Sequence, residues 1–113
     1  QIRKAKRLSE AILLGDFNSG PNIAQINYEY LLDDFTDSAA TKASSTITWD
    51  ANIMLNKSGL FTSSISQKPD HIFLSNSLAA KVSVQSSEIL FTRSLKNEIH
   101  LSDHYGILTE LKF

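Results

Sequence analysis

The chain has 113 residues, enough for about one small domain, and 42% of them are hydrophobic, so a core can be buried. Eleven basic and 12 acidic side chains leave a formal charge of −1, which argues against binding nucleic acid or a membrane surface through bulk positive charge. The chain lacks cysteine, which excludes a disulfide scaffold and a thiolate site, and it lacks any apolar run near the roughly 18 residues that span a bilayer.

The first residues predict a helix followed by a strand. Residues 2–10 place apolar side chains three apart between basic ones, which is typical of the end of an amphipathic helix. The basic side chains there fit either a solvated helix face or a patch that faces phosphate. The apolar run 11–14 ends at Gly15 and predicts a strand in a sheet that is covered on both faces.

A polar loop over residues 16–22 separates this strand from a second helix. Asn22 is the expected N-cap of that helix, which is predicted over 23–33. The apolar residues expected to form its buried face are Ile23, Ile26, Tyr30 and Leu31.

The remainder of the chain predicts mostly strands. Runs of β-branched, aromatic and alternating apolar residues alternate with segments rich in Ser, Asn and Gly. Mixed α and β content with dominant strands favours packing as a sandwich. In chain order we expect strand 35–37, loop 39–45, strand 46–49, loop 50–66, strand 71–74, one or two strands within 81–91, and strand 105–113.

Acidic and imidazole side chains occur at the ends of three apolar strands, where a rigid scaffold can present them to a cleft. An Asp beside a turn is more often a cap or an Asx-turn, so each place alone is a weak signal. Three such places in the order D-x-N, P-D-H and S-D-H together point to one site. They are Asp16 with Asn18, Asp70 with His71, and Asp103 with His104.

These residues belong to segments that resemble the later motifs of the endonuclease/exonuclease/phosphatase superfamily. The segments are GDFN at 15–18, PDHIFL at 69–74 and LSDHYG at 101–106, and the resemblance spans residues 11–113. The superfamily includes deoxyribonucleases, neutral sphingomyelinases and tyrosyl-DNA phosphodiesterases. The resemblance implies an α+β fold: half of a four-layer α/β-β/α sandwich, with mostly antiparallel sheet and flanking helices.

The resemblance also implies a role for each matching residue. The family's GDFN aspartate orients or deprotonates the attacking water, which implies that role for Asp16. Asn18 is implied to hydrogen-bond the phosphoryl oxygens. His104 is implied to contact the phosphate and stabilise the transition state, with Asp70 paired to it. Asp103 is implied to be a ligand of a divalent metal.

The chemistry explains why a cation is expected. A phosphodiester is anionic and repels hydroxide, and a hard divalent cation bound by oxygen ligands relieves this repulsion. Because the implied ligands are carboxylate and amide oxygens, Mg²⁺ is the expected cofactor, with Mn²⁺ as the alternative. We expect His71 to pack or lie at the rim, and His100 to have no catalytic role.

The family's domain is longer than this chain, and residues 1–113 are implied to be its C-terminal half. The N-terminal half carries an asparagine and the glutamate that is the principal metal ligand, and neither has a recognisable counterpart upstream of Asp16. We therefore expect the missing half as a partner, within a longer protein or as a separate chain. Residues 1–113 alone are expected to bind metal weakly and to turn over little substrate.

The segment Thr48-Trp49-Asp50, followed by Asn52 and Asn56, resembles one near the substrate entrance of neutral sphingomyelinases and tyrosyl-DNA phosphodiesterases. Trp49 and Asn52 are the candidate substrate-binding residues, although a Trp that only packs in a strand also fits the pattern. We expect a metal-dependent hydrolase of phosphoesters, chiefly phosphodiesters, that acts on a lipid head group or another small phosphodiester. The alternatives are an enzyme that cleaves nucleic acid (a nuclease or a tyrosyl-DNA phosphodiesterase) and a catalytically inactive binding module.

Overall fold

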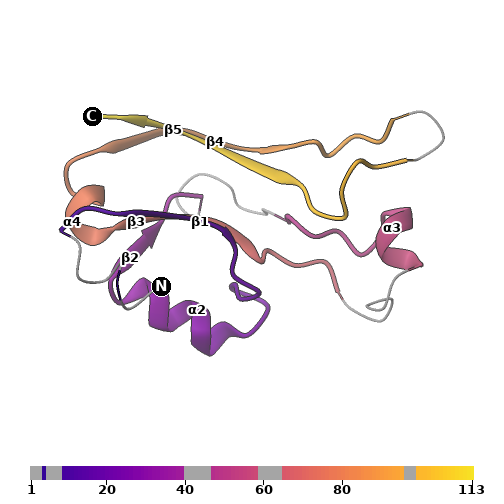
Figure 1. The fold of residues 1–113 in the computed structure, drawn as a ribbon, viewed down its shortest axis with the longest axis horizontal. Coiled ribbons are helices and arrows are strands. Elements are labelled where there is room, and N and C mark those ends of the chain that lie inside the picture. Colours follow the sequence, from indigo (N-terminus) through magenta and orange to yellow (C-terminus); the bar gives the residue numbers. More distant parts are fainter. Residues whose placement is uncertain (1–3, 5–8, 40–46, 59–64, 96–98) are drawn as a thin grey trace.

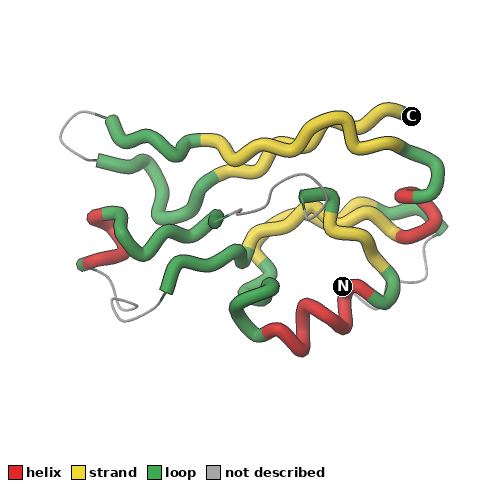
Figure 2. Tube along the Cα trace, turned by 180° about the vertical axis from the view of Figure 1, so that it is seen from behind, coloured by secondary structure: helices red, strands yellow, loops and turns green. Residues whose placement is uncertain are grey.

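The computed structural model describes residues 4, 9–39, 47–58, 65–95 and 99–113. The strands form a three-stranded sheet in the order β1-β3-β2 and a two-stranded sheet β4-β5, and every pairing is antiparallel. Figures 1 and 2 show the β4-β5 hairpin as one layer, the three-stranded sheet as the next, and α2 beyond it. The α+β class is therefore confirmed. The elements are β1 (Ile12–Asp16), α2 (Gln25–Leu32), β2 (Phe35–Asp37), α3 (Met54–Lys57), β3 (Asp70–Ser75), α4 (Asn76–Ala79), β4 (Ser83–Leu90) and β5 (Gly106–Lys112).

The main core lies between α2 and the three-stranded sheet. Tyr28, Leu31, Phe35 and Phe73 are buried there, and the ring of Phe17 meets that of Phe73 edge-on, with centroids 5.1 Å apart. Burial of apolar surface is the dominant favourable term in folding. Because Phe17 belongs to the GDFN motif, this core also fixes that motif against β3.

The start of α2 differs from the sequence prediction. Ala24 precedes the helix with a left-handed φ of 44° and no side-chain cap, so Asn22 is not the N-cap. The Asn22 amide instead donates to the carbonyl of Ser66 at 3.0 Å. Ile23 lies before the helix and pairs with Gly20 across a tight turn. A contact far away in the sequence has thus displaced the expected cap.

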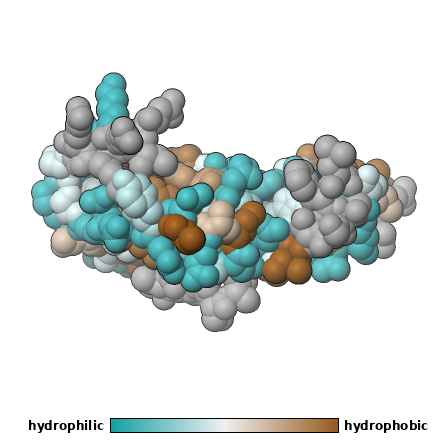
Figure 3. Space-filling model, turned by 90° about the horizontal axis from the view of Figure 1, so that it is seen from below, coloured by the Kyte–Doolittle hydropathy of each residue, from teal (hydrophilic) through white to brown (hydrophobic). Residues whose placement is uncertain are grey.

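The buried face of α2 was predicted correctly at Leu31 and wrongly at Ile26 and Tyr30. Ile26 is 82% exposed and Tyr30 is 58% exposed, whereas Tyr28 and Leu31 are buried. The physical reason is polar: the Tyr28 hydroxyl donates to the buried carboxylate of Asp37 at 3.0 Å, which turns Tyr28 inward. Seen from the side of α2, the surface is mainly hydrophilic with separate apolar side chains (Figure 3).

Strand β1 lies where the sequence predicts it, but it is covered on one face only. Leu13 packs against the core, while Leu14 is 73% exposed and Ile12 is 43% exposed. Within the described part of the chain, these two side chains thus remain open to solvent, Leu14 more than Ile12. The prediction of a strand covered on both faces is therefore wrong for the described residues.

Other segments differ in smaller ways. The strand predicted over 46–49 is reduced to a single bridge between Trp49 and Gln67. Helix α3 lies within the loop predicted over 50–66. Helix α4 was not predicted, and its N-cap Ser75 accepts a bond from the backbone amide of Leu78.

The other strand predictions agree with the structure: residues 35–37 form β2, and residues 71–74 lie within β3. The region 81–91 forms one strand, β4, and the last strand, β5, lies within 105–113. The helix predicted over 2–10 and the loop predicted over 39–45 lie mostly outside the described residues. None of the helices within the described ranges is long and apolar enough to cross a membrane.

Candidate active site

Strand pairing brings the first two motifs together. Asp16 ends β1 and Asp70 begins β3, and the antiparallel register places their Cα atoms opposite each other. The next residue, Phe17, donates its backbone amide to the carbonyl of Pro69 at 2.9 Å, which continues the contact beyond the strands. Residues 54 positions apart in sequence are therefore neighbours at one edge of the sheet.

The GDFN loop forms a local turn around its own carboxylate. Asp16 Oδ1 accepts from the backbone amide of Asn18 at 2.7 Å, and Oδ2 accepts from the Asn18 side-chain amide at 3.4 Å. Asn18 has a left-handed φ of 48°, a conformation that Asn adopts more readily than most residues. The turn keeps the carboxylate and the amide side by side.

The third motif reaches the first two through a histidine–carboxylate pair. His104 Nδ1 lies 2.7 Å from Asp70 Oδ2, and the two side chains are 28% and 19% exposed. A carboxylate only accepts, so Nδ1 carries the proton and Nε2 is the ring nitrogen left for a ligand. Thr48 braces the pair: its hydroxyl accepts from the Asp70 amide at 3.2 Å, and its carbonyl accepts from the Tyr105 amide at 2.6 Å.

These groups line one open pocket of about 320 Å³, which we call the motif pocket. Asp70 is not among the lining residues, but its hydrogen bond to His104 holds that side chain in place. Asn52 does not line the motif pocket: its side-chain amide donates to Asp50 Oδ1 at 3.0 Å, and Asn52 lies at a separate pocket. The lining residues of the motif pocket are Asp16, Asn18, Ile23, Trp49, Gln67, Pro69, Asp103 and His104.

Sequence reasoning missed the part played by Asn56. Its side chain is buried, and its amide nitrogen donates to two backbone carbonyls, those of Asp50 at 2.8 Å and Asp103 at 3.1 Å. Asp50 follows Trp49 and Asp103 precedes His104, so one amide ties together two loops that line the motif pocket. The T-W-D…N spacing was the available signal, but it gave no reason to prefer Asn56 over Asn52.

Replacing Asn56 by Ala is expected to destabilise the fold by about 1–3 kcal/mol, because two carbonyls lose their donor. The separated loops should also expose Trp49, the only tryptophan, so its fluorescence should shift to the red and be quenched more readily by acrylamide. Asn27→Ala, at an exposed position of α2, is the matched control and should leave both properties unchanged. Equal behaviour of the two variants would contradict the role of Asn56.

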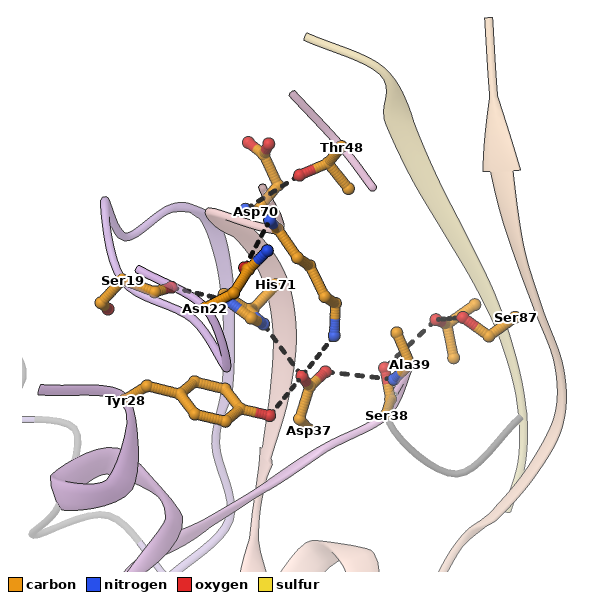
Figure 4. Close-up of polar contacts among 12 residues, drawn as sticks. Ser19, Asn22, Tyr28, Asp37, Ser38, Ala39, Thr48, Asp70, His71 and Ser87 are labelled. Atoms are coloured by element: carbon orange, nitrogen blue, oxygen red, sulfur yellow. Dashed lines mark hydrogen bonds and ion pairs between the residues drawn. The ribbon is translucent and has the colours of Figure 1, made fainter. Parts of the chain in front are cut away.

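A buried polar cluster lies on the opposite side of β3 from the Asp70 carboxylate (Figure 4). Asp37 Oδ2 accepts from the Tyr28 hydroxyl at 3.0 Å, from Lys68 Nζ at 2.5 Å and from His71 Nδ1 at 2.9 Å. Burial by itself raises the pKa of Asp37, but the hydrogen bond from His71 and the charge of Lys68 outweigh it and lower that pKa to about 2. Burial and the neighbouring Asp37 raise the pKa of Tyr28.

His71 connects this cluster to the GDFN loop. Its Nε2 lies 2.7 Å from the Ser19 carbonyl, and its Nδ1 faces the Asp37 carboxylate. Both ring nitrogens therefore face acceptors, a carboxylate on one side and a backbone carbonyl on the other. At Gly20, a Cβ would lie 2.1 Å from the Lys68 carbonyl, so only glycine allows this approach. His71 packs, as expected, and it also fixes the loop that presents Asp16 and Asn18.

The low pKa of Asp37 makes stability depend on pH in acid. An ionised group whose pKa is lower in the folded than in the unfolded state contributes fully above its unfolded pKa, near 4, and the contribution disappears as pH falls through about 2. We expect a loss of about 2 kcal/mol across this window, measured by urea unfolding. Asp33→Asn, at an exposed site, should show the same loss as the wild type. An unchanged free energy of unfolding of the wild type between pH 4 and pH 2 would contradict the account.

Comparison of the chain with protein-family models, with curated proteins and with solved structures finds no match in any of the three. The family resemblance therefore depends on the three motifs. In the structure, their residues meet at the motif pocket and the Asp70–His104 pair.

Proposed function

We propose that this chain is the C-terminal half of a divalent-metal-dependent phosphodiesterase. The observation that carries the proposal is the convergence of Asp16, Asn18 and His104 at one pocket, with Asp70 bonded to the histidine at 2.7 Å. These residues come from three segments that are distant in the sequence. The Asp16 carboxylate can accept a proton, the Asn18 amide is a neutral hydrogen-bond donor, and the His104 imidazole is a donor that can carry a positive charge. That set suits hydrolysis of an anionic ester.

In the proposed reaction, a water oxygen bonds to phosphorus and the bond from phosphorus to the leaving oxygen breaks. Asp16 orients the water and takes its proton. The Asn18 amide and the Nε2–H of His104 donate to the phosphoryl oxygens on which charge develops. Asp70 holds the imidazole in place and stabilises its positive charge. The leaving oxygen takes its proton from solvent.

The oxygen ligands that the motif pocket offers are of the type that a hard cation binds. Asp103 and Asp16 both line it, and Mg²⁺ commonly binds one or two protein carboxylates while keeping several waters. The described residues hold no group of three or more His, Cys, Asp or Glu side chains that could bind a metal. Asp103, with Asp16 nearby, would hold the ion, whose charge would offset that of the phosphoryl oxygens. A further ligand from the missing half agrees with this partial set.

The uncovered face of β1 supports the proposal of a missing half. Leu14 and Ile12 present apolar side chains outward from a strand that leads directly into the GDFN motif. Covering such side chains contributes about 25 cal/mol per Å² of apolar surface removed from water. A second half packed there would complete a layer beside the motif pocket.

Among substrates, we propose a lipid head group or another small phosphodiester. The formal charge of −1 does not favour nucleic acid, and the motif pocket combines Trp49 and Ile23 with its polar groups. A nuclease is the alternative if the missing half carries a basic groove.

The experiment uses bis(p-nitrophenyl) phosphate with Mg²⁺. We expect little turnover by residues 1–113 and at least about a hundredfold more once the segment encoded upstream of Gln1 is included, since that segment would supply metal binding. EDTA should abolish the gain and Mg²⁺ should restore it. Strong activity of residues 1–113 alone, or activity that is insensitive to EDTA, would contradict the proposal.

A further inference from the structure

A second pocket, of about 340 Å³, lies behind one wall of the motif pocket. We call it the loop pocket; α3 and the loop that follows β4 line it, and Figures 1 and 2 show these two segments at the same end of the molecule. Trp49 and His104 line the motif pocket, and the residues directly after them, Asp50 and Tyr105, line the loop pocket. Two pairs of consecutive residues, Trp49-Asp50 and His104-Tyr105, therefore separate the two pockets.

The loop pocket is lined by the carboxylate of Asp50, which already accepts four hydrogen bonds. Asp50 Oδ1 accepts from the backbone and side-chain amides of Asn52 at 2.9 and 3.0 Å and from the Ser66 hydroxyl at 3.1 Å. Asp50 Oδ2 accepts from the Tyr105 hydroxyl at 3.1 Å. Burial opposes its ionisation, but these bonds outweigh burial and lower the pKa of Asp50. Its negative charge is thus spread over four donors.

Four further polar side chains of the loop pocket make no hydrogen bond within the described ranges, although the His100 ring lies beside that of Tyr105, with centroids 6.1 Å apart. Lys57, Thr92, Ser94 and His100 line the pocket, and within the described residues no hydrogen bond or ion pair is recorded for these four side chains. Ser94 and His100 flank a backbone bond from the Leu95 amide to the Ile99 carbonyl, 2.7 Å long, which brings them together. An ammonium, an imidazole and two hydroxyls therefore meet at one open cavity.

We infer that the loop pocket is a second anion subsite, which binds a phosphate group of the substrate other than the one that is cleaved. Ammonium and imidazolium donors with hydroxyls are the partners that a phosphate oxyanion takes. The anion subsite itself does not depend on the proposed function. Only the assignment of its phosphate to the substrate of the motif pocket rests on that function. It narrows the substrates to those with a second phosphate, either a nucleic-acid strand or a doubly phosphorylated small molecule.

The test measures binding and needs no turnover. In a His104→Ala background, inorganic phosphate is titrated at pH 6, and the ring signals of His100 are followed by NMR. We expect a saturable shift, and about tenfold weaker binding in Lys57→Met. Lys112→Met, at an exposed position of β5, is the control and should not change the affinity. An unmoved His100, or equal effects of the two lysine variants, would overturn the inference.

The source of the phosphate is distinguished by matched ligands in the same assay. The dinucleotide pTpT should bind more tightly than TpT if a nucleic-acid strand is the source. Glycerophosphoinositol 4-phosphate should bind more tightly than glycerophosphoinositol if a small ester is the source. If neither pair differs, the assignment to the substrate is wrong. A failure of phosphodiester hydrolysis would not affect any of these titrations.

Discussion

Replacing Asp70 by Asn is expected to lower kcat for phosphodiester hydrolysis by about 10²–10⁴-fold, and His104→Ala should have an effect of the same order. The carboxylate of Asp70 lies 2.7 Å from His104 Nδ1, where it fixes the tautomer and stabilises the imidazolium. An amide cannot supply that charge, and its NH₂ can turn toward Nδ1. The measurement is kcat for bis(p-nitrophenyl) phosphate with Mg²⁺, on the chain extended upstream of Gln1.

The control for this experiment is Asp33→Asn, which changes an exposed carboxylate at the end of α2 and should leave kcat unchanged. Added imidazole should partly restore His104→Ala and should not restore Asp16→Asn, because only the first variant lacks an imidazole. Full activity in Asp70→Asn or in His104→Ala would show that the pair does not act in catalysis.

Replacing Asp37 by Asn is expected to lower the free energy of unfolding by about 3–5 kcal/mol. The side chains of Asp37 and His71 are fully buried and that of Lys68 is 5% exposed. Removing the carboxylate therefore leaves the Lys68 ammonium in the interior without its counter-charge, and it takes away the partner of His71 Nδ1. Small domains have about 5–15 kcal/mol in total, so the variant should lose a large part of its stability and unfold at a clearly lower urea concentration. Urea unfolding followed by circular dichroism measures the change.

Asp33→Asn again provides the comparison, since the same chemical change at an exposed site should alter stability by no more than about 0.5 kcal/mol. If Asp37→Asn unfolds at the urea concentration of the wild type, the buried cluster does not hold the fold as we describe. A variant that fails to fold at all agrees with the prediction.

The parts of the fold that the sequence predicted well are those set by local pattern. The apolar run that became β1 and the alternation in β5 identified strands, and their places agree with the structure. Predictions failed where a distant contact decided the outcome. Ile26 was expected to be buried, but the bond from Tyr28 to Asp37 turns α2 another way. The exposed face of β1 could not be predicted, because an apolar run does not show which of its faces another element covers.

The candidate site was predictable in its residue types and not in its supports. The motifs named Asp16, Asp70 and His104, and the structure brings these three together. The supports depend on single bonds across long sequence separations, such as Asn56 to the Asp103 carbonyl and His71 to the Ser19 carbonyl. No spacing rule connects those pairs, so only the three-dimensional structure could reveal them.

The most direct test of the central claim is to hydrolyse bis(p-nitrophenyl) phosphate in ¹⁸O-labelled water with the extended chain and Mg²⁺. If water activated in the motif pocket attacks phosphorus, mass spectrometry should find one ¹⁸O in each p-nitrophenyl phosphate formed and none in the p-nitrophenol. In His104→Ala the rate of labelled product should fall by about 10²–10⁴-fold. Label in the p-nitrophenol, or the same rate in the wild type and the variant, would contradict the account.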